Sequence, residues 1–347
     1  MMNDLREVGK LWSEAGEPGP ARLAAVRQRF LQETRSEERP GGLGTRRPWR
    51  AWGVRTATAG GLVAAVTAGT LVLVGGSGPG SAPADAAELL TLAAQAAGDG
   101  QVTDPRPGQF AYRESVALEL STGSGGSWFR KVRYQEWRRA DGRVPVYRRT
   151  TLLGLVPLPG EKVPAKAWEL ARVSTGGRFL PCASRPTEPN APYAVHKELP
   201  TDPARLRGAL AAGVDAGQRA ELSEDQAVWI NLTALASAQP PPKVQAALFT
   251  VARQIQGTRL SGRTTDAAGR PGLAVTFDTR PGEREELIFD AKTYRFLGWR
   301  GTAAGTGDTS PAATTTADVA VTKTAIVDGL PAGVSTPGHT CPDESGD

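Results

Sequence analysis

The chain has 347 residues, of which 39% are hydrophobic and 22% charged, and its formal net charge is +5. This length can hold one large domain or two modest ones. The net charge is small for the length and does not amount to the concentrated basic face that nucleic-acid binding needs. The two cysteines have no CxxC or Cys/His ligand spacing around them, which argues against a structural zinc site.

The first 50 residues predict an N-terminal arm with two short amphipathic helices. The second of these, over residues 21–34, places Leu23, Val26 and Phe30 on one face. Helices of this size cannot bury a core of their own, so this face is expected to pack on a partner: the other helix, the bilayer surface or another protein. The alternative is that the arm rests at the membrane surface and binds no protein.

Residues 53–76 predict a transmembrane helix, because no charged residue occurs from Thr56 to Ala84. Arginines and tryptophans typical of a membrane interface precede it: Arg46, Arg47, Trp49, Arg50, Trp52 and Arg55. The linker that follows, residues 77–84, has no basic residue. By the positive-inside rule, this predicts a single-pass protein of the cell membrane with a cytoplasmic arm and an extracytoplasmic C-terminal domain.

The sequence leaves two alternatives to a retained membrane anchor. One is a buried core helix, although such helices rarely lack charge over so long a stretch. The other is a cleaved export signal, because Arg46 and Arg47 resemble a twin-arginine signal and Ala82-Pro83-Ala84 has small residues at cleavage spacing. The long arm ahead of the arginines has a helical pattern, which favours the anchor.

Residues 85–330 predict an exported domain that begins with a helix. Asp85 and Glu88 have the spacing of a helix cap, and the helix ends at Gly98. The pattern then changes to alternation, which predicts three strands: Phe110–Leu120, Trp128–Tyr134 and Arg143–Leu153. Charged residues such as Glu136 and Arg138 alternate with apolar ones, which predicts that one face of this sheet lies in water.

The rest of the domain is predicted to contain a long loop, a group of helices and more strands. The segment 155–200 is rich in Pro and Gly, with one strand expected near Trp168–Val173. Asp202 caps one helix, Ser223 and Gln226 open another, and a third follows the prolines at 240–242. The later strands are expected at Thr258–Thr265, Leu273–Thr279, Glu285–Phe289, Tyr294–Arg300 and Val319–Val327. The predicted class is α+β, with a curved antiparallel sheet packed on helices.

The two cysteines, Cys182 and Cys341, both follow the predicted span. In an oxidising compartment they can form one long-range disulfide, which would hold the otherwise flexible tail of residues 331–347. The alternative is two unrelated thiols. Sequence separation does not decide between these alternatives, because a disulfide requires the two α-carbons to lie close together.

Several short motifs occur in the same order as in a family of actinobacterial single-pass membrane proteins, which this chain resembles over nearly its whole length. They are PGQFAYRE, QEW followed by ADGR, ELPTDPARLRGAL and LIFDAKTYRFLGW. The layout also resembles that of membrane-anchored anti-sigma factors, although the arm lacks the HxxxCxxC motif of their zinc-binding variety. The exported part resembles the lipoprotein-carrier group, including the RseB-type sensors of envelope stress, which implies a half-barrel sheet around an apolar groove. Neither resemblance implies an enzymatic activity, so no catalytic residue is carried over.

Few residues have a pattern that indicates chemistry. His196 and His339 lie in separate polar stretches without a ligand partner at suitable spacing, so each is expected to be a surface histidine. Acidic residues gather along a late hairpin: Asp278, Glu283, Glu285, Glu286 and Asp290. Paired carboxylates can hydrolyse glycosides, but arginines interleave with these, which favours a solvated strand edge. The sequence therefore predicts no catalytic, metal-binding or cofactor-binding residue.

The large aromatic residues are expected to form most of the core. Four of them are also candidates for lining a groove that takes an acyl chain or an apolar peptide: Trp229, Phe249, Phe277 and Phe289. The two expectations differ in the exposure of these side chains.

Three functions follow from these features. In the favoured one, the protein is an extracytoplasmic sensor or scaffold whose arm passes a binding event to a cytoplasmic partner such as a sigma factor. In the second, the outer domain binds a lipid or lipoprotein and the arm is inert. The third, a cell-envelope hydrolase, has only the acidic hairpin in its support.

Overall fold

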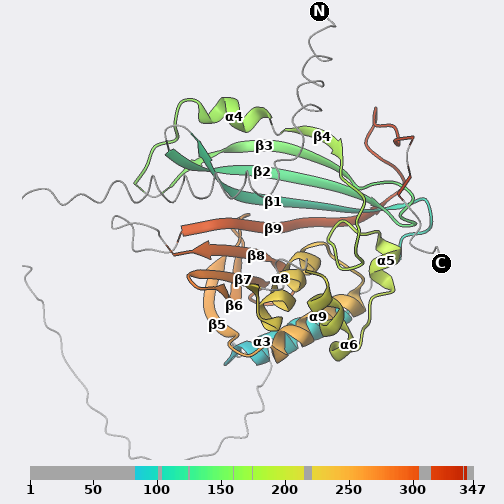
Figure 1. Ribbon diagram of the computed structural model, residues 1–347, viewed down its shortest axis with the longest axis vertical. Helices are drawn as coiled ribbons and strands as arrows, with labels where there is room; N and C mark the ends of the chain where they lie inside the picture. Colours follow the sequence, from blue (N-terminus) through green and yellow to red (C-terminus); the bar gives the residue numbers. More distant parts are fainter. Residues whose placement is uncertain are drawn as a thin grey trace, which may run out of the picture. The chain divides into compact units, whose positions relative to one another are not determined.

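The computed structural model describes residues 83–100, 104–123, 126–158, 160–173, 175–214, 221–304, 314–338 and 340–341. These residues form an α+β domain with one nine-stranded antiparallel sheet, in the order β4-β3-β2-β1-β9-β8-β7-β6-β5 (Figure 1). The strands are β1 (Phe110–Gly123), β2 (Gly126–Arg139), β3 (Tyr147–Pro157), β4 (Gly176–Phe179), β5 (Arg259–Thr265), β6 (Pro271–Arg280), β7 (Glu283–Asp290), β8 (Phe296–Ala303) and β9 (Thr314–Val327). The described helices are α3 (Ala86–Gly98), α4 (Ala167–Val173), α5 (Tyr193–Lys197), α6 (Pro203–Ala212), α8 (Glu224–Ser237) and α9 (Pro242–Gln254). The predicted α+β class is confirmed.

The predicted caps begin three of the helices. The Asp85 carboxylate accepts a hydrogen bond of 2.8 Å from the backbone N–H of Glu88 at the start of α3. Ser223 and Gln226 form a complete capping box at α8, and Asp202 caps α6. These bonds satisfy backbone donors that a helix leaves unpaired at its first turn, so the sequence determines these boundaries locally.

The strand predicted near Trp168–Val173 is wrong, because these residues form helix α4. The segment is composed of good helix formers, and Ala167 and Ala171 are buried at a spacing of one helical turn. Trp168 and Leu170 are exposed on the same helix. The third predicted strand also begins at Tyr147 rather than Arg143.

One half of the domain is a sheet covered by helices. In this helix-covered half, α3, α8 and α9 pack against β5–β8, and α6 packs on α8 and α9 (Figure 1). Its core includes Leu89, Trp229, Leu248 and Phe289, each with at most 1% of its surface exposed. Burial of such apolar side chains, at about 25 cal/mol per Å2, is the main stabilising contribution in this half.

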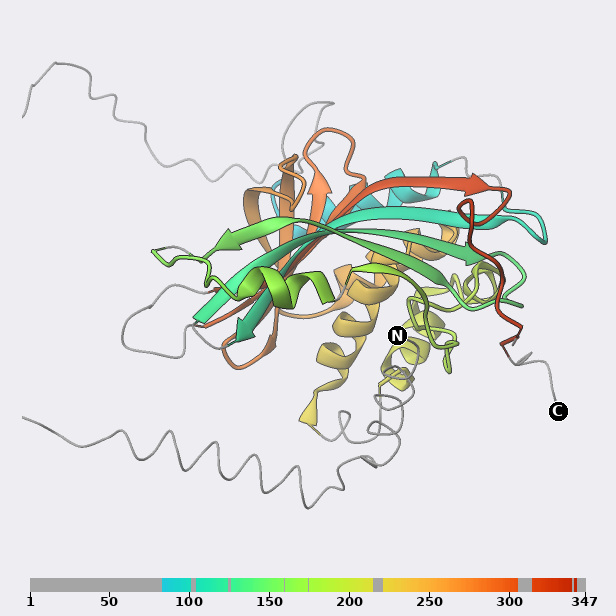
Figure 2. The same ribbon diagram turned by 90° about the horizontal axis from the view of Figure 1, so that it is seen from above.

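The other half consists of β1–β4, named here the wing, and β9 joins it to the helix-covered half. The strands β1, β2 and β3 are long and curved (Figure 2). Four aromatic residues lie directly opposite one another on one face: Tyr112, Trp137, Tyr147 and Phe179. Their neighbouring ring centroids lie 5.1–5.6 Å apart, and Leu330 and Val334 of the C-terminal segment pack against the same cluster. This aromatic row is a second, smaller core.

The opposite face of the wing has a row of charged residues in place of the aromatic row. Arg113, Glu136, Arg148 and Arg178 lie opposite one another on the four strands. This face points toward the end of α8, because the Arg113 guanidinium donates to the backbone carbonyl of Ser237. Burial of Glu136 and Arg138, at 5% and 4% exposure, corrects the expectation that this face lies in water.

Within the described residues, no helix has both the length and the apolar character needed to cross a membrane. The predicted span, residues 53–76, and the predicted arm, residues 1–50, lie outside the described residues.

Candidate functional site

The candidate site lies at the end of the wing where β2, α5 and the C-terminal segment meet. Several residues singled out from sequence lie elsewhere or outside the described residues. The interface residues Arg46, Arg47, Trp49, Arg50, Trp52 and Arg55, and the arm residues Leu23, Val26 and Phe30, belong to the second group, as does His339.

The four aromatic candidates for a groove line neither of the two pockets described below. Trp229, Phe249, Phe277 and Phe289 are 0%, 1%, 7% and 0% exposed and belong to the core of the helix-covered half. Phe249 packs edge-on against Phe289, with 5.1 Å between ring centroids. The groove expectation for these residues is therefore corrected: they hold α8 and α9 against the sheet.

The carboxylates of the late hairpin are mostly engaged in structural interactions. Asp278 forms ion pairs with Arg259 and Arg284, at 2.7 and 3.0 Å. Glu283 lies 3.5 Å from Arg280 and Glu286 lies 3.7 Å from Arg300. The Asp290 carboxylate accepts two backbone N–H bonds in the following turn, from Lys292 and Thr293.

Glu285 differs from its neighbours because its carboxylate faces α8. The Trp229 indole and the Thr233 hydroxyl of α8 interact with this carboxylate. Burial raises the pKa of Glu285 to about 7, an effect that the neighbouring Thr233 and Trp229 side chains only partly offset. This carboxyl therefore changes its charge near neutral pH.

Cys182 and Cys341 form a disulfide across a sequence separation of 159 residues, with 5.7 Å between their α-carbons. The backbone N–H of Cys341 also donates to the carbonyl of Arg143, at 3.4 Å. The sequence left open whether the cysteines pair. Only the folded chain brings them together, and the bond ties the C-terminal segment beside the aromatic row.

His196 is fully buried, which corrects the expectation of a surface histidine. Its Nε2 lies 2.9 Å from the carbonyl oxygen of Glu188, and its Nδ1 lies 3.0 Å from a terminal nitrogen of Arg138. Burial and the Arg138 charge lower the pKa of His196 to about 3, so the ring is neutral. The consistent assignment has Nε2–H donating to Glu188 and Nδ1 accepting from Arg138.

Glu136 is the buried anion of this region, and it is shared between two arginines. Arg113 Nε donates to one carboxylate oxygen at 2.9 Å and Arg148 Nε to the other at 2.7 Å. Burial by itself would raise the pKa of Glu136, but the Arg113, Arg148 and Arg138 charges outweigh it and lower the pKa to about 2. Glu136 is therefore ionised, and two direct cation partners saturate it.

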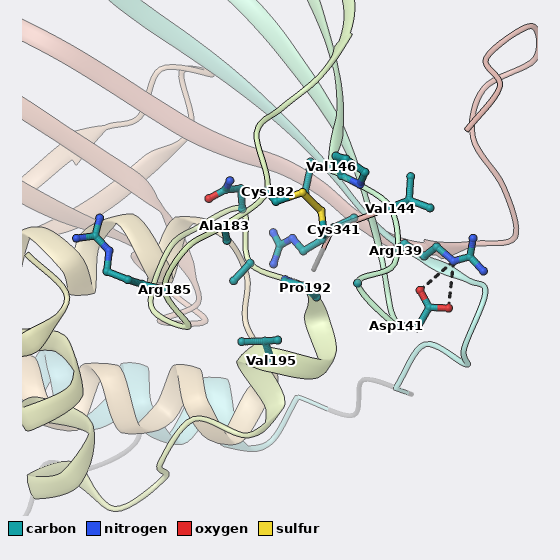
Figure 3. A pocket seen from close by; sticks show the side chains of 15 residues that line it. Arg139, Asp141, Val144, Val146, Cys182, Ala183, Arg185, Pro192, Val195 and Cys341 are labelled. Atoms are coloured by element: carbon teal, nitrogen blue, oxygen red, sulfur yellow. Dashed lines mark hydrogen bonds and ion pairs between the residues drawn. A yellow bond between two sulfur atoms is a disulfide. The ribbon is translucent and has the colours of Figure 1, made fainter. Parts of the chain in front are cut away.

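A cavity of about 90 Å3 lies beside this network (Figure 3). Its wall includes the Cys182–Cys341 disulfide, Arg138, Arg139 and Asn190. Arg139 and Asp141, which also line the cavity, form an ion pair at 2.9 Å, seen at the right of Figure 3. The wall therefore combines apolar side chains such as Val144 and Val146 with donors that can orient a ligand.

A larger groove of about 560 Å3 adjoins this cavity, because Arg185 and Val195 line both. It lies between α5, α6 and the loop before α5, and most of its lining is apolar: Pro186, Val195, Leu199, Pro200, Ala209 and Ala212. Its volume is within the range of ligand pockets, about 300–1,000 Å3. The sequence indicated the helix α6 but had no signal for the groove.

The residues of the described part include no group of three or more His, Cys, Asp or Glu side chains arranged to hold a metal ion. The network around Arg138 was missed from sequence because its members come from β1, β2, β3 and α5. The only local signal was the Glu136-x-Arg138 alternation, which is typical of a solvated strand face.

No protein-family model matches the chain. No curated protein matches it either. Among solved structures, the complex of Pseudomonas aeruginosa MucA/MucB is similar over 72% of this chain and 59% of that chain, so the match spans less than two thirds of the other chain. The sequence identity is 11% and the TM-score is 0.21. A likeness this distant carries no argument about function.

Proposed function

We propose that this protein is a membrane-anchored extracytoplasmic sensor or scaffold that catalyses no reaction. Its outer domain binds a ligand, and its N-terminal arm passes the event to a cytoplasmic partner such as a sigma factor. The observation that carries the proposal is the groove of about 560 Å3 beside the disulfide-tied end of the wing. A preformed apolar groove of this size is the usual form of a small-ligand or peptide site.

Two features support the extracytoplasmic location of the domain. Disulfides persist in oxidising compartments, and the Cys182–Cys341 bridge closes a long loop of this domain. The uncharged stretch from Thr56 to Ala84, with arginines on its N-terminal side alone, supports an anchor with the arm in the cytoplasm.

The arm is tested with the full-length protein, purified from its native membrane with and without a triple substitution, Leu23→Asp, Val26→Asp and Phe30→Asp. We expect a cytoplasmic regulator to co-purify with the unaltered protein and to be lost from the triple variant, because three charges abolish the apolar face. If the unaltered protein retains no cytoplasmic partner, the sensor proposal is wrong.

The second candidate function is lipid or lipoprotein binding with an inert arm, which the apolar lining of the groove favours. Mass spectrometry of solvent extracts from the purified full-length protein tests it. An Ala209→Trp substitution fills the groove, and Ala204→Trp on the exposed side of the same helix α6 is the matched control. Lipid that disappears with Ala209→Trp and remains with Ala204→Trp supports this function. Equal lipid content in all three proteins contradicts it.

A further inference from the structure

The segment that follows β9 is attached to the wing chiefly by one covalent bond. This segment, residues 328–338 with Cys341, is named here the strap, and its described residues form no helix or strand. Two hydrogen bonds join it to other described residues. Gln109 Nε2 donates to the Asp328 carboxylate at 2.7 Å, and the Cys341 backbone N–H donates to the carbonyl of Arg143 at 3.4 Å. The disulfide ties the far end of the strap to the loop before α5.

The strap covers the aromatic row from outside the sheet. Its Leu330 and Val334 pack on the row, whereas the other described apolar residues packed there lie in strands of the same sheet. With the strap in place, Trp137 and Tyr147 are only 7% and 6% exposed. Without this cover, four aromatic rings on one sheet face form an apolar patch in water, which folded domains rarely expose. The position of the strap therefore decides whether this face is buried.

Non-covalent contacts alone hold the strap weakly. Its described residues contribute two partly buried aliphatic side chains and two hydrogen bonds to the wing. Ordering the segment costs backbone entropy at every residue, and each hydrogen bond to the protein replaces one to water. The disulfide offsets this cost because it holds the far end in place. Loss of the bond therefore favours an open strap, while the core of the helix-covered half, which includes no strap residue, stays intact.

The disulfide is placed where a reductant can reach it. Cys182 and Cys341 are both partly exposed, and both line the cavity of about 90 Å3 (Figure 3). A disulfide is cleaved when a thiolate attacks one of its sulfur atoms, so a partly exposed bond at a cavity wall is open to exchange. The chain has two cysteines in total, so no other thiol of the protein can pair with either of them.

We propose that the strap is a redox switch, which covers the aromatic row while Cys182 and Cys341 are bonded and opens when a dithiol reduces them. One thiolate of the dithiol attacks the disulfide and forms a mixed disulfide, and the second thiol of the dithiol then displaces the remaining cysteine. The S–S bond of the protein is replaced by one in the dithiol, and two electrons and two protons pass to the cysteines. The proposal deepens the sensor function by naming its stimulus, and it rests on that function for this role alone.

The experiment compares the oxidised and reduced full-length protein in a neutral detergent. Dithiothreitol, a small dithiol, is the probe, and alkylation followed by mass spectrometry reports the reduced fraction of the cysteine pair. Hydrogen exchange of residues 328–338 reports opening of the strap, and hydroxyl-radical labelling of Trp137 reports uncovering of the row. Trp229, which is fully buried in the helix-covered half, is the internal control for labelling. The double variant Cys182→Ser, Cys341→Ser is the control for the reductant, because it has no disulfide to lose.

We expect dithiothreitol to reduce the pair in the folded protein. Exchange in residues 328–338 should then rise at least tenfold and labelling of Trp137 at least twofold, while Trp229 and the amides of β6 and β7 do not change. Reoxidation should restore the closed values. The double variant should match the reduced protein both with and without dithiothreitol.

Three outcomes overturn the proposal: reduction that leaves the strap and Trp137 protected, reduction that occurs only after denaturation, and reduction that also exposes β6 and β7. The third outcome assigns the disulfide to global stability. A failure of the arm to retain a cytoplasmic partner contradicts the proposed sensor but leaves these readouts unaffected. The two failures can therefore be told apart.

Discussion

The helix-covered half and the wing are stabilised in different ways. The first has a continuous apolar core in which α3, α8 and α9 bury one face of β5–β8 and α6 packs on α8 and α9. The wing has a small aromatic row on one face and a buried charged network on the other, and a disulfide ties the C-terminal segment to its end. The candidate site lies where the two halves meet: the cavity is at the end of the wing, and the adjoining groove is lined by α5 and by α6 of the helix-covered half. Stability is therefore concentrated in the helix-covered half, and the binding surface lies at its edge, beside the wing.

The largest expected effect comes from the apolar core. Phe289→Ala should lower the free energy of unfolding by about 3–5 kcal/mol, because it leaves a cavity among fully buried neighbours. Phe179→Ala should lower the free energy of unfolding clearly less. Phe179 lies at the edge of the aromatic row, where its ring is only partly buried. Urea denaturation of both variants measures the difference. Equal losses would mean that the two halves share one core.

Removal of the disulfide is expected to have the next largest effect, confined to the wing. The double variant Cys182→Ser, Cys341→Ser should lose about 2–4 kcal/mol, since the bridge closes a loop of 159 residues. Amide hydrogen exchange should increase in β1–β4 and in residues 328–338, while amides of β6 and β7 remain protected. Uniformly increased exchange in both halves would contradict separate stabilisation of the wing.

The two halves should contribute opposite pH dependences to the free energy of unfolding. In the wing, the folded-state pKa of His196 is about 3 against an ordinary value of 6.5, so the unfolded chain binds the extra proton between these values. His196 therefore lowers the free energy of unfolding as the pH falls below 6.5, by about 1.4 kcal/mol per pH unit. A His196→Gln variant should lack this contribution, and unfolding curves between pH 5 and 6.5 measure it. The same slope in variant and parent would show that His196 is protonated in the fold.

In the helix-covered half, Glu285 should act with the opposite sign. Its folded pKa of about 7 exceeds the ordinary value of 4.5, so the folded chain binds the extra proton and stability falls as pH rises between these values. Glu285→Gln should therefore be more stable than the parent at pH 8, by about 1–2 kcal/mol after allowance for partial exposure, and similar to it at pH 4.5. Because His196 and Glu285 act in opposite directions, the free energy of unfolding of the parent protein should be nearly independent of pH between pH 5 and 6.5. A large slope there would show that one of the two assignments is wrong.

The sequence by itself determined the local features of this protein. The caps at Asp85, Asp202 and Ser223 define helices because the side chain and the backbone N–H that it accepts from are three residues apart. Alternation predicted the strands of the antiparallel sheet, since the side-chain period of two is a local property. The segment at α4 was assigned wrongly because short apolar stretches suit a strand or a helix equally, and packing against β3 decided between them.

The tertiary structure alone decided the site. Whether Glu136 and Arg138 face water or a helix depends on what covers β2, and that cover, α5 and α8, comes from residues 55 to 101 positions later in the chain. The same holds for His196, for the pairing of Cys182 with Cys341, and for the aromatic residues that became core instead of a groove. Burial and charge compensation are properties of neighbours in space, and a strand pattern carries no information about which distant residues those neighbours are.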